Sequence, residues 1–352
     1  MRIVHISDLH AGRQYTPTSD PESHWMWAFP GFQGMIGHSL SALGALEAFV
    51  ERMRSEDPST LVALTGDLTA HGHSSEFAVA AAFMGDADGL PFDQSALSEP
   101  LWQDRTVPGN HDSWGWSKSS IPHWPGCVTG ACRPERQTCT GQMPAVGDLI
   151  PIADDWTLRF LRLDTDRDVN SPPIDIIRRA TAVGAFLQDI EELEQQLPKR
   201  QDREVRVLLL HHCAETGTTG IGPARVEKWL GVCPSSVERL RKLVSDHRID
   251  ALLCGHLHTV LIKRRFRDLP VLYARCGTTA QQSPAHVAEP LLRSLREVGI
   301  QPTADLLGRL FKQQTLTLLT HDLIPDGDHL LWTPKTWVLD ADAMAFKEDT
   351  VL

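Results

Sequence analysis

Short apolar runs and longer amphipathic segments alternate along most of the chain. The short runs are rich in valine, isoleucine and leucine, which is typical of strands buried on both faces of a sheet. They cover residues 2–7, 61–65, 205–210 and 250–254, with 106–108 as a shorter fifth run. Apolar residues recur at helical spacing over residues 39–54, 74–84, 181–197 and 235–247. The alternation predicts an α/β fold, in which ligands gather beyond the carboxyl ends of the strands.

One long stretch in the middle of the chain does not follow this alternation. Residues 113–147 are rich in glycine, proline, tryptophan and cysteine and show no clear period. Loops of this length are usually functional or disordered. Because three tryptophans lie within it, we interpret the stretch as an ordered insertion that borders the functional site.

The end of the chain has a pattern of its own. It shows one helical segment, 287–298, and two alternating runs, 315–323 and 330–339, on either side of a turn signal. We therefore expect a catalytic domain over residues 1–280 and a C-terminal extension over 281–352, in which a helix and a strand pair pack on the core.

Composition and charge narrow the classes of protein. Hydrophobic residues make up 41% and charged residues 22%, so the chain is of ordinary globular composition rather than disordered. The formal net charge is −11, so the chain lacks the excess of basic residues that is typical of proteins that bind long nucleic acid. We see no signal peptide and no apolar run long enough to span a membrane. The seven cysteines are an odd number, and we expect a soluble, cytoplasmic protein with reduced thiols.

Two short motifs place metal-binding side chains two residues apart. Asp8-Leu9-His10 combines a carboxylate with an imidazole, and His256-Leu257-His258 combines two imidazoles. In an extended segment, residues at this spacing point the same way. Each pair can therefore reach one metal ion.

Three further candidates follow the remaining apolar runs. Asp67 comes after a glycine and has room to bridge two ions, Asn110 offers a neutral carbonyl oxygen, and His211 offers a nitrogen. Such mixed aspartate, asparagine and histidine ligands suit manganese, iron, zinc, cobalt or nickel rather than an all-oxygen magnesium or calcium site.

Each motif also has a structural explanation when it stands alone. An aspartate after a strand is usually a helix cap, Gly66-Asp67 is a common turn, and the segment 109–112 could be a polar loop. His211-His212 could be a hydrogen-bonded pair at a strand end, and residue type alone does not choose between the two. All five motifs, however, occur in order at the ends of apolar runs, which favours a shared metal site.

The order of these motifs resembles that of the calcineurin-like metallophosphoesterases. The matching pattern is Asp-x-His, Gly-Asp, Gly-Asn-His-Asp, His and Gly-His-x-His, from Asp8 to His258. The segment 66–72 followed by Glu76-Phe77 resembles the bacterial branch of cyclic-nucleotide and glycerophosphodiester phosphodiesterases. The serine/threonine protein phosphatases instead carry Asp-Arg-Gly after the Gly-Asp and a glutamate after the Asn-His, and this chain has neither.

The resemblance implies a metallophosphoesterase fold, which is a four-layer α/β/β/α sandwich of two mixed sheets flanked by helices. It also implies two transition-metal ions (manganese, iron or zinc) that share Asp67. The ligands of the first ion would be Asp8, His10, Asp67 and His258, and those of the second Asp67, Asn110, His211 and His256.

The resemblance implies catalytic roles as well. His111 would be the histidine that meets the leaving group or the phosphoryl oxygen without binding metal. Asp112 could orient that ring, and a helix-cap role is about equally compatible with its position. The chain departs from the branch after the histidine pair, where Cys213-Ala214 replace the usual prolines.

Together these observations predict a hydrolase of small phosphate esters, with phosphodiesters such as cyclic nucleotides favoured. A phosphomonoesterase or protein phosphatase is the enzymatic alternative, and a metal-free scaffold of the same fold is the non-enzymatic one. Nucleic acid is disfavoured as a partner by the negative charge. The two terminal runs could extend the sheet or form a contact in a homodimer.

Overall fold

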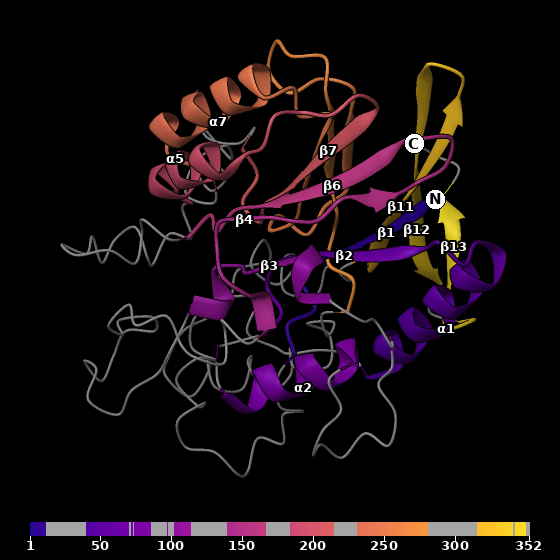
Figure 1. Cartoon of the computed structure of the whole chain (residues 1–352). Helices are drawn as coiled ribbons and strands as arrows, with labels where there is room; N and C mark the ends of the chain where they lie inside the picture. The colour runs from indigo at the N-terminus through magenta and orange to yellow at the C-terminus, as the bar shows by residue number, and fades with distance from the viewer. Residues whose placement is uncertain are drawn as a thin grey trace, which may run out of the picture.

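The computed structural model describes residues 1–11, 40–69, 72, 74–85, 97, 102–113, 139–166, 184–214, 231–280, 315–340 and 342–349. The helix expected over 287–298 and most of the insertion expected over 113–147 lie outside these ranges. Within them, two mixed sheets pack against each other and helices cover both outer faces (Figure 1). The four-layer α/β fold predicted from the resemblance is confirmed.

The first sheet combines strands from both ends of the chain in the order β13-β12-β11-β1-β2-β3. Its strands are β1 (Arg2–Ile6), β2 (Leu61–Thr65), β3 (Thr106–Val107), β11 (Thr317–Asp326), β12 (His329–Asp340) and β13 (Ala345–Asp349). Strands β1, β2 and β3 run parallel to one another. Strand β11 pairs with β1 in the antiparallel sense, with His5 opposite Leu319. Strands from the last part of the sequence thus belong to the sheet that begins at the N-terminus.

The second sheet has the order β4-β6-β7-β8-β10-β9, and β5 pairs with β6. Its strands are β4 (Ala145–Val146), β5 (Ile150–Pro151), β6 (Thr157–Arg162), β7 (Glu204–Leu209), β8 (Ala251–Cys254), β9 (Leu261–Lys263) and β10 (Leu272–Arg275). Strands β6, β7, β8 and β10 are parallel to one another. Their carboxyl ends therefore meet at one edge of the sheet.

In the described part of the chain, helices cover the outer face of each sheet (Figure 1). These are α1 (Leu40–Glu56) and α2 (Ser74–Met84) on the first sheet, and α5 (Leu187–Gln196) and α7 (Pro234–Asp246) on the second. Helix α5 begins later than the helical pattern at 181–197 suggests. Two hydrogen bonds hold the preceding residues outside the helix, from Ala185 N–H to Thr165 O and from Phe186 N–H to Ser236 Oγ. Among the described residues, none of the helices combines the length and the apolar character needed to cross a membrane.

The alternation of side chains along the strands explains the layers. On β1, Val4 and Ile6 pack towards α1, whereas Ile3 packs between the sheets. On β7, Leu208 packs towards α5 and α7, whereas Val207 packs between the sheets. Because β1, β2, β7 and β8 are buried on both faces, they read in the sequence as continuous apolar runs.

Candidate metal centre

The predicted ligands come from five loops that meet where the two sheets end. Asp8 and His10 follow β1, Asp67 follows β2, Asn110 follows β3, His211 follows β7, and His256 and His258 follow β8. Backbone hydrogen bonds join neighbouring loops, from Asp8 N–H to Gly66 O (3.0 Å) and from Gly255 N–H to His211 O (3.1 Å). The two sheets are joined where His256 N–H donates to Asp8 Oδ2 (3.1 Å). The loops therefore form one connected unit.

Glycines allow the ligands of different loops to approach one another closely. A Cβ atom on Gly109 would lie 2.1 Å from Asp67 Oδ1, and one on Gly66 would lie 2.3 Å from His211 Nδ1. On Gly255 it would lie 1.8 Å from Ser7 Oγ. Each glycine thus leaves the space that a side chain from another loop fills.

Backbone strain is concentrated on the predicted ligands. The φ angles of Asp8, His10, Asp67, His256 and His258 are 55°, 49°, 49°, 75° and 53°. Residues other than glycine rarely adopt positive φ, at a cost on the order of 1–3 kcal/mol each. Such strain persists only where the surrounding structure holds it and tends to cluster at functional sites. Five strained residues in one centre indicate a site built for binding.

Asp8, His10 and His258 form the first group of possible ligands. His258 Nε2 lies 3.1 Å from Asp8 Oδ1 and 3.2 Å from His10 Nε2. His10 Nε2 lies 3.9 Å from Asp8 Oδ1 and 3.9 Å from Asp67 Oδ2. The side chains of Asp8 and His10 are fully buried, whereas that of His258 is 16% exposed. Solvent therefore reaches this group at His258.

Asp67, His211 and His256 form the second group, and Asn110 lies beside it. His211 Nε2 lies 3.1 Å from Asn110 Oδ1, 3.2 Å from His256 Nδ1 and 3.4 Å from Asp67 Oδ2. Because Asp67 Oδ2 also faces His10 of the first group, this one oxygen is common to both groups.

The chemistry of His211 indicates that a cation fits this centre. His211 Nδ1 lies 2.8 Å from the Thr65 carbonyl oxygen, which can only accept a hydrogen bond, so Nδ1 carries a hydrogen. In the neutral ring the lone pair on Nε2 then faces the Asn110 and Asp67 oxygens, which are also acceptors. A cation between these atoms would satisfy all of them, and a backbone carbonyl is a common outer partner of a metal-bound histidine.

The separations between the side-chain atoms also fit metal ions. Ligands about 2.0–2.2 Å from one ion at angles of about 90–110° lie about 3.0–3.5 Å apart. The distances from His258 to its two partners, 3.1 and 3.2 Å, fall in this range, as do the three distances from His211. The two distances from His10 Nε2, 3.9 Å to Asp8 Oδ1 and 3.9 Å to Asp67 Oδ2, are longer than this range, so His10 would move closer on binding an ion.

The protonation states agree with this fit. Burial lowers the pKa of His10 and His256 well below the usual value, which keeps the metal-binding lone pairs free. Burial opposes the charged form of Asp67, but the surrounding histidines hold the pKa of its carboxyl well below the usual range. Burial also opposes a charged His211, yet the carboxylates of Asp67 and Asp8 raise its pKa to about 10. Without metal the His211 ring is therefore charged at neutral pH, and a metal ion bound at Nε2 would displace that proton.

His111 lies at the border of the two groups. Its backbone N–H donates to Asp67 Oδ1 (2.9 Å), which leaves Oδ2 to face the ligands of both groups. Its Nε2 lies 3.8 Å from Asp67 Oδ2, and its ring meets that of His10 edge to face at 4.7 Å. His111 thus lies beside the Asp67 oxygen that both groups share, and the role towards a bound ester that the resemblance implies stays a prediction.

Asp112 is fully buried and ties two ligand loops together. Its carboxylate accepts hydrogen bonds from Leu68 N–H (3.2 Å), Thr69 N–H (2.9 Å), Thr69 Oγ1–H (2.8 Å) and Gly109 N–H (2.8 Å). Burial and the nearby Asp67 carboxylate raise the pKa of Asp112 to about 6. These contacts hold the loops that carry Asp67 and Asn110. The predicted orientation of the His111 ring by Asp112 stays a prediction.

The structure separates the two members of the histidine pair. Whereas His211 faces Asp67 and Asn110, His212 Nδ1 lies 2.7 Å from Thr165 Oγ1, on the loop after β6. Sequence reasoning missed Thr165 and did not resolve His212 from residue type. The available signal was weaker than for the other loops, because the polar group Asp164-Thr165-Asp166 follows a run, residues 157–163, that two arginines interrupt.

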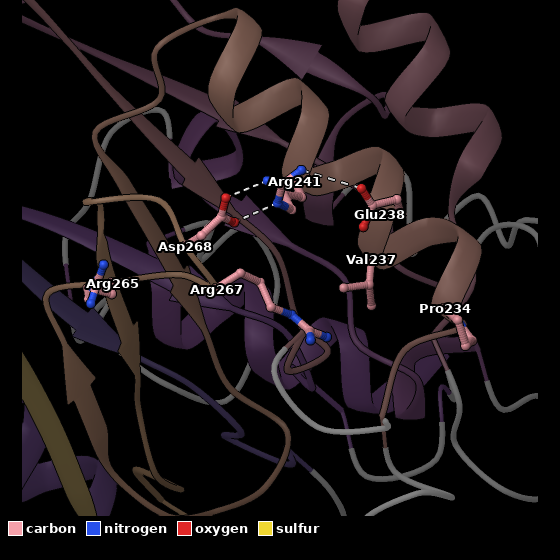
Figure 2. Close-up of a pocket in the computed structure, with 7 residues that line it drawn as sticks. All are labelled: Pro234, Val237, Glu238, Arg241, Arg265, Arg267 and Asp268. Atoms are coloured by element: carbon pink, nitrogen blue, oxygen red, sulfur yellow. Dashed lines mark hydrogen bonds and ion pairs between the residues drawn. The ribbon is translucent and has the colours of Figure 1, made fainter. Parts of the chain in front are cut away.

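A separate pocket of about 630 Å³ lies between α7 and the connection of β9 to β10 (Figure 2). Its lining includes Val237, Arg241, Arg267 and Asp268, and Figure 2 shows Arg241 paired with Asp268 across it. None of its lining residues is a predicted metal ligand. We therefore place the functional site at the metal centre and not in this pocket.

Comparison with known families identifies the fold family. The sequence model of the calcineurin-like phosphoesterases matches residues 1–260, which contain every predicted ligand. The chain belongs to the calcineurin-like phosphoesterase family. This family comprises metal-dependent phosphoesterases, in agreement with the aspartate and histidine groups described above.

Comparisons with individual proteins are less informative. No curated protein sequence matches the chain. A dimetal phosphatase from Danio rerio is 14% identical, with 96% of this chain and 94% of that chain covered and a TM-score of 0.49. The calcineurin-like phosphoesterase YfkN from Bacillus subtilis is 12% identical, with 96% and 90% covered and a TM-score of 0.42. At these values the likenesses carry no conclusion about substrate.

Proposed function

We propose that this calcineurin-like phosphoesterase uses two metal ions to hydrolyse small phosphodiesters such as cyclic nucleotides. The observation that carries the proposal is the sharing of Asp67 Oδ2, which lies 3.4 Å from His211 Nε2 on one side and 3.9 Å from His10 Nε2 on the other. A carboxylate oxygen between two sets of ligands is the arrangement that a binuclear centre requires.

The proposed ligands follow from the two groups. The first ion would be held by Asp8, His10, Asp67 and His258, and the second by Asp67, Asn110, His211 and His256. Nitrogen ligands outnumber carboxylates, so manganese, iron or zinc suits the centre better than magnesium or calcium. When bound, such a pair of ions supplies a water of lowered pKa and offsets charge on the phosphoryl oxygens.

The protein residues would supply positioning and a proton. The backbone N–H of His111 fixes the Asp67 carboxylate, so the ring of the same residue is held beside the shared oxygen. A histidine can donate a proton or a hydrogen bond at neutral pH because its ordinary pKa is near 6.5. We assign His111 the role of general acid towards the leaving group, and Asp112 the role of holding the two ligand loops.

The preference for diesters rests on the segment 66–72 and Glu76-Phe77, which resembles the phosphodiesterase branch. A phosphomonoesterase would use the same centre, so substrates must decide between them. Metal-stripped protein reloaded with manganese should hydrolyse bis(p-nitrophenyl) phosphate with a higher kcat/KM than p-nitrophenyl phosphate. A higher value for the monoester would reverse the assignment of substrate class. A protein that binds two ions but hydrolyses neither ester would support the scaffold alternative.

A further inference from the structure

The His212 ring packs against both histidines of the second group, His211 and His256. Its Nδ1 is directed at Thr165. Its ring centroid is 4.4 Å from that of His256, with the planes tilted by 46°, and 5.2 Å from that of His211. The other side of the ring is bounded by Gly184, where a Cβ atom would lie 2.7 Å from His212 Cγ. His212 is fully buried, and its ring packs between Gly184 and His256.

Thr165 fixes the orientation of the His212 ring. The Thr165 hydroxyl oxygen accepts the backbone N–H of His212 (3.2 Å), and it lies 2.7 Å from Nδ1 of the same residue. The described contacts give the hydroxyl hydrogen no other acceptor, and Thr165 is fully buried. The hydrogen bond between Thr165 Oγ1 and His212 Nδ1 holds the ring in place whichever of the two atoms donates.

The orientation of His256 depends on packing. A metal-bound histidine usually donates its outer N–H to a carboxylate or carbonyl, which fixes the ring. His211 follows this rule through Thr65, but His256 Nε2 has no hydrogen-bond partner among the described residues. The backbone of His256 is also strained, at φ 75°. The His212 ring, 4.4 Å away, packs more closely against His256 than the His211 ring does at 5.0 Å, and it can hold His256 with Nδ1 turned inward, 3.2 Å from His211 Nε2.

We propose that His212 is a positioning residue for the second ion, which holds the His256 ring in its binding orientation, and that Thr165 holds His212 in turn. The inference rests on the proposed function, because it concerns the ion that His256 would bind. It predicts an effect on one site only. The first ion, held by Asp8, His10, Asp67 and His258, would keep its affinity.

The test measures metal affinity in the full-length chain. Metal-stripped wild type, His212→Ala, Thr165→Val and Thr165→Ser are titrated with manganese by calorimetry, and bound metal is counted by elemental analysis after dialysis. We expect His212→Ala to weaken the second ion by about 10–100-fold, the usual effect of losing an outer-shell partner, and to leave the first unchanged. Thr165→Val should act in the same direction, and Thr165→Ser, which keeps the hydroxyl, should restore the affinity.

A matched control comes from another buried threonine. Thr320 on β11 accepts a hydrogen bond from Trp337 Nε1 (3.0 Å), so Thr320→Val also removes one buried hydroxyl but should leave both affinities unchanged. If His212→Ala does not fold, the Thr165→Val and Thr165→Ser pair decides alone.

Three results would overturn the inference. The first is an affinity for the second ion within twofold of wild type in His212→Ala or, if that variant does not fold, in Thr165→Val. The second is an equal loss of affinity for both ions. The third is a Thr165→Ser variant that does not regain the affinity that Thr165→Val loses. Wild type that binds fewer than two ions would instead overturn the proposed function, and the inference with it. The count in wild type thus distinguishes the two failures.

Discussion

The replacement of Gly255 by alanine tests whether close approach of the loops assembles the metal centre. The new Cβ would lie 1.8 Å from Ser7 Oγ, 2.6 Å from Asp8 Oδ2 and 2.9 Å from Ser7 Cβ. Non-bonded carbon atoms are normally separated by about 3.5 Å. Rotation of the Ser7 hydroxyl could relieve only the first contact, and it would break the hydrogen bond to Thr65 O. Asp8 would therefore have to move by roughly 1 Å.

The consequence should be larger for function than for stability. Overpacking of this kind costs about 1–3 kcal/mol in folding free energy, whereas a displacement of about 1 Å in a catalytic group can slow turnover by about 10²-fold. This movement also disturbs the hydrogen bond that Asp8 Oδ2 accepts from the His256 N–H. We therefore expect Gly255→Ala to fold, to bind the first ion weakly, and to hydrolyse bis(p-nitrophenyl) phosphate about 10²-fold more slowly.

Gly44 supplies the control. It lies in α1, and a Cβ atom there would meet nothing within 4 Å, so Gly44→Ala should raise stability by about 0.5–1 kcal/mol and leave turnover unchanged. Metal content, turnover and thermal unfolding are measured for both variants. Gly255→Ala with two ions bound and turnover within twofold of wild type would refute the close-approach argument.

Three further predictions concern single side chains. Asp67→Ala should lose both ions and nearly all turnover; metal analysis of the purified variant checks this, and unchanged metal content would contradict a shared ligand. His111→Ala should keep both ions but slow turnover by about 10²–10⁴-fold, with a smaller loss on esters whose leaving group needs no proton; equal losses on good and poor leaving groups would argue against a general acid. Burial lowers the pKa of His321 to about 3, so the unfolded chain takes up a proton there between about pH 6.5 and 3 while the folded chain does not, and stability falls as pH falls through this window. The unfolding free energy measured with denaturant should fall between pH 7 and pH 5, and this fall should be smaller in His321→Gln than in wild type by up to about 2 kcal/mol. Equal falls in the two proteins would show that His321 does not contribute.

The strands that carry the ligands could be predicted because burial on both faces makes them continuous apolar runs. Strand β6 was missed because Arg159 and Arg162 interrupt its run. Both arginines are buried with partners, Arg159 with Glu204 (2.8 Å) and Arg162 with the Thr140 carbonyl (2.7 Å). Pairing of this kind depends on tertiary contacts, so a local pattern does not reveal it.

The places of the candidate ligands in the fold could be predicted because each follows a strand within a short motif, and metal binding by these residues stays a prediction. The partners that orient the ligands could not, since they are distant in sequence and ordinary in type. Thr65 offers only a backbone carbonyl to His211, and Thr165 reaches His212 across 47 positions. The role of the motif glycines also needed the structure, because the atoms that fill their space belong to other loops.

The central claim is that two metal ions share Asp67. Crystals grown with manganese and measured at a wavelength where manganese scatters anomalously test it most directly. The account predicts two anomalous peaks about 3.5–4 Å apart, on either side of Asp67 Oδ2, one beside His258 and one beside His256. A single peak, or two peaks that do not share Asp67, would contradict the account.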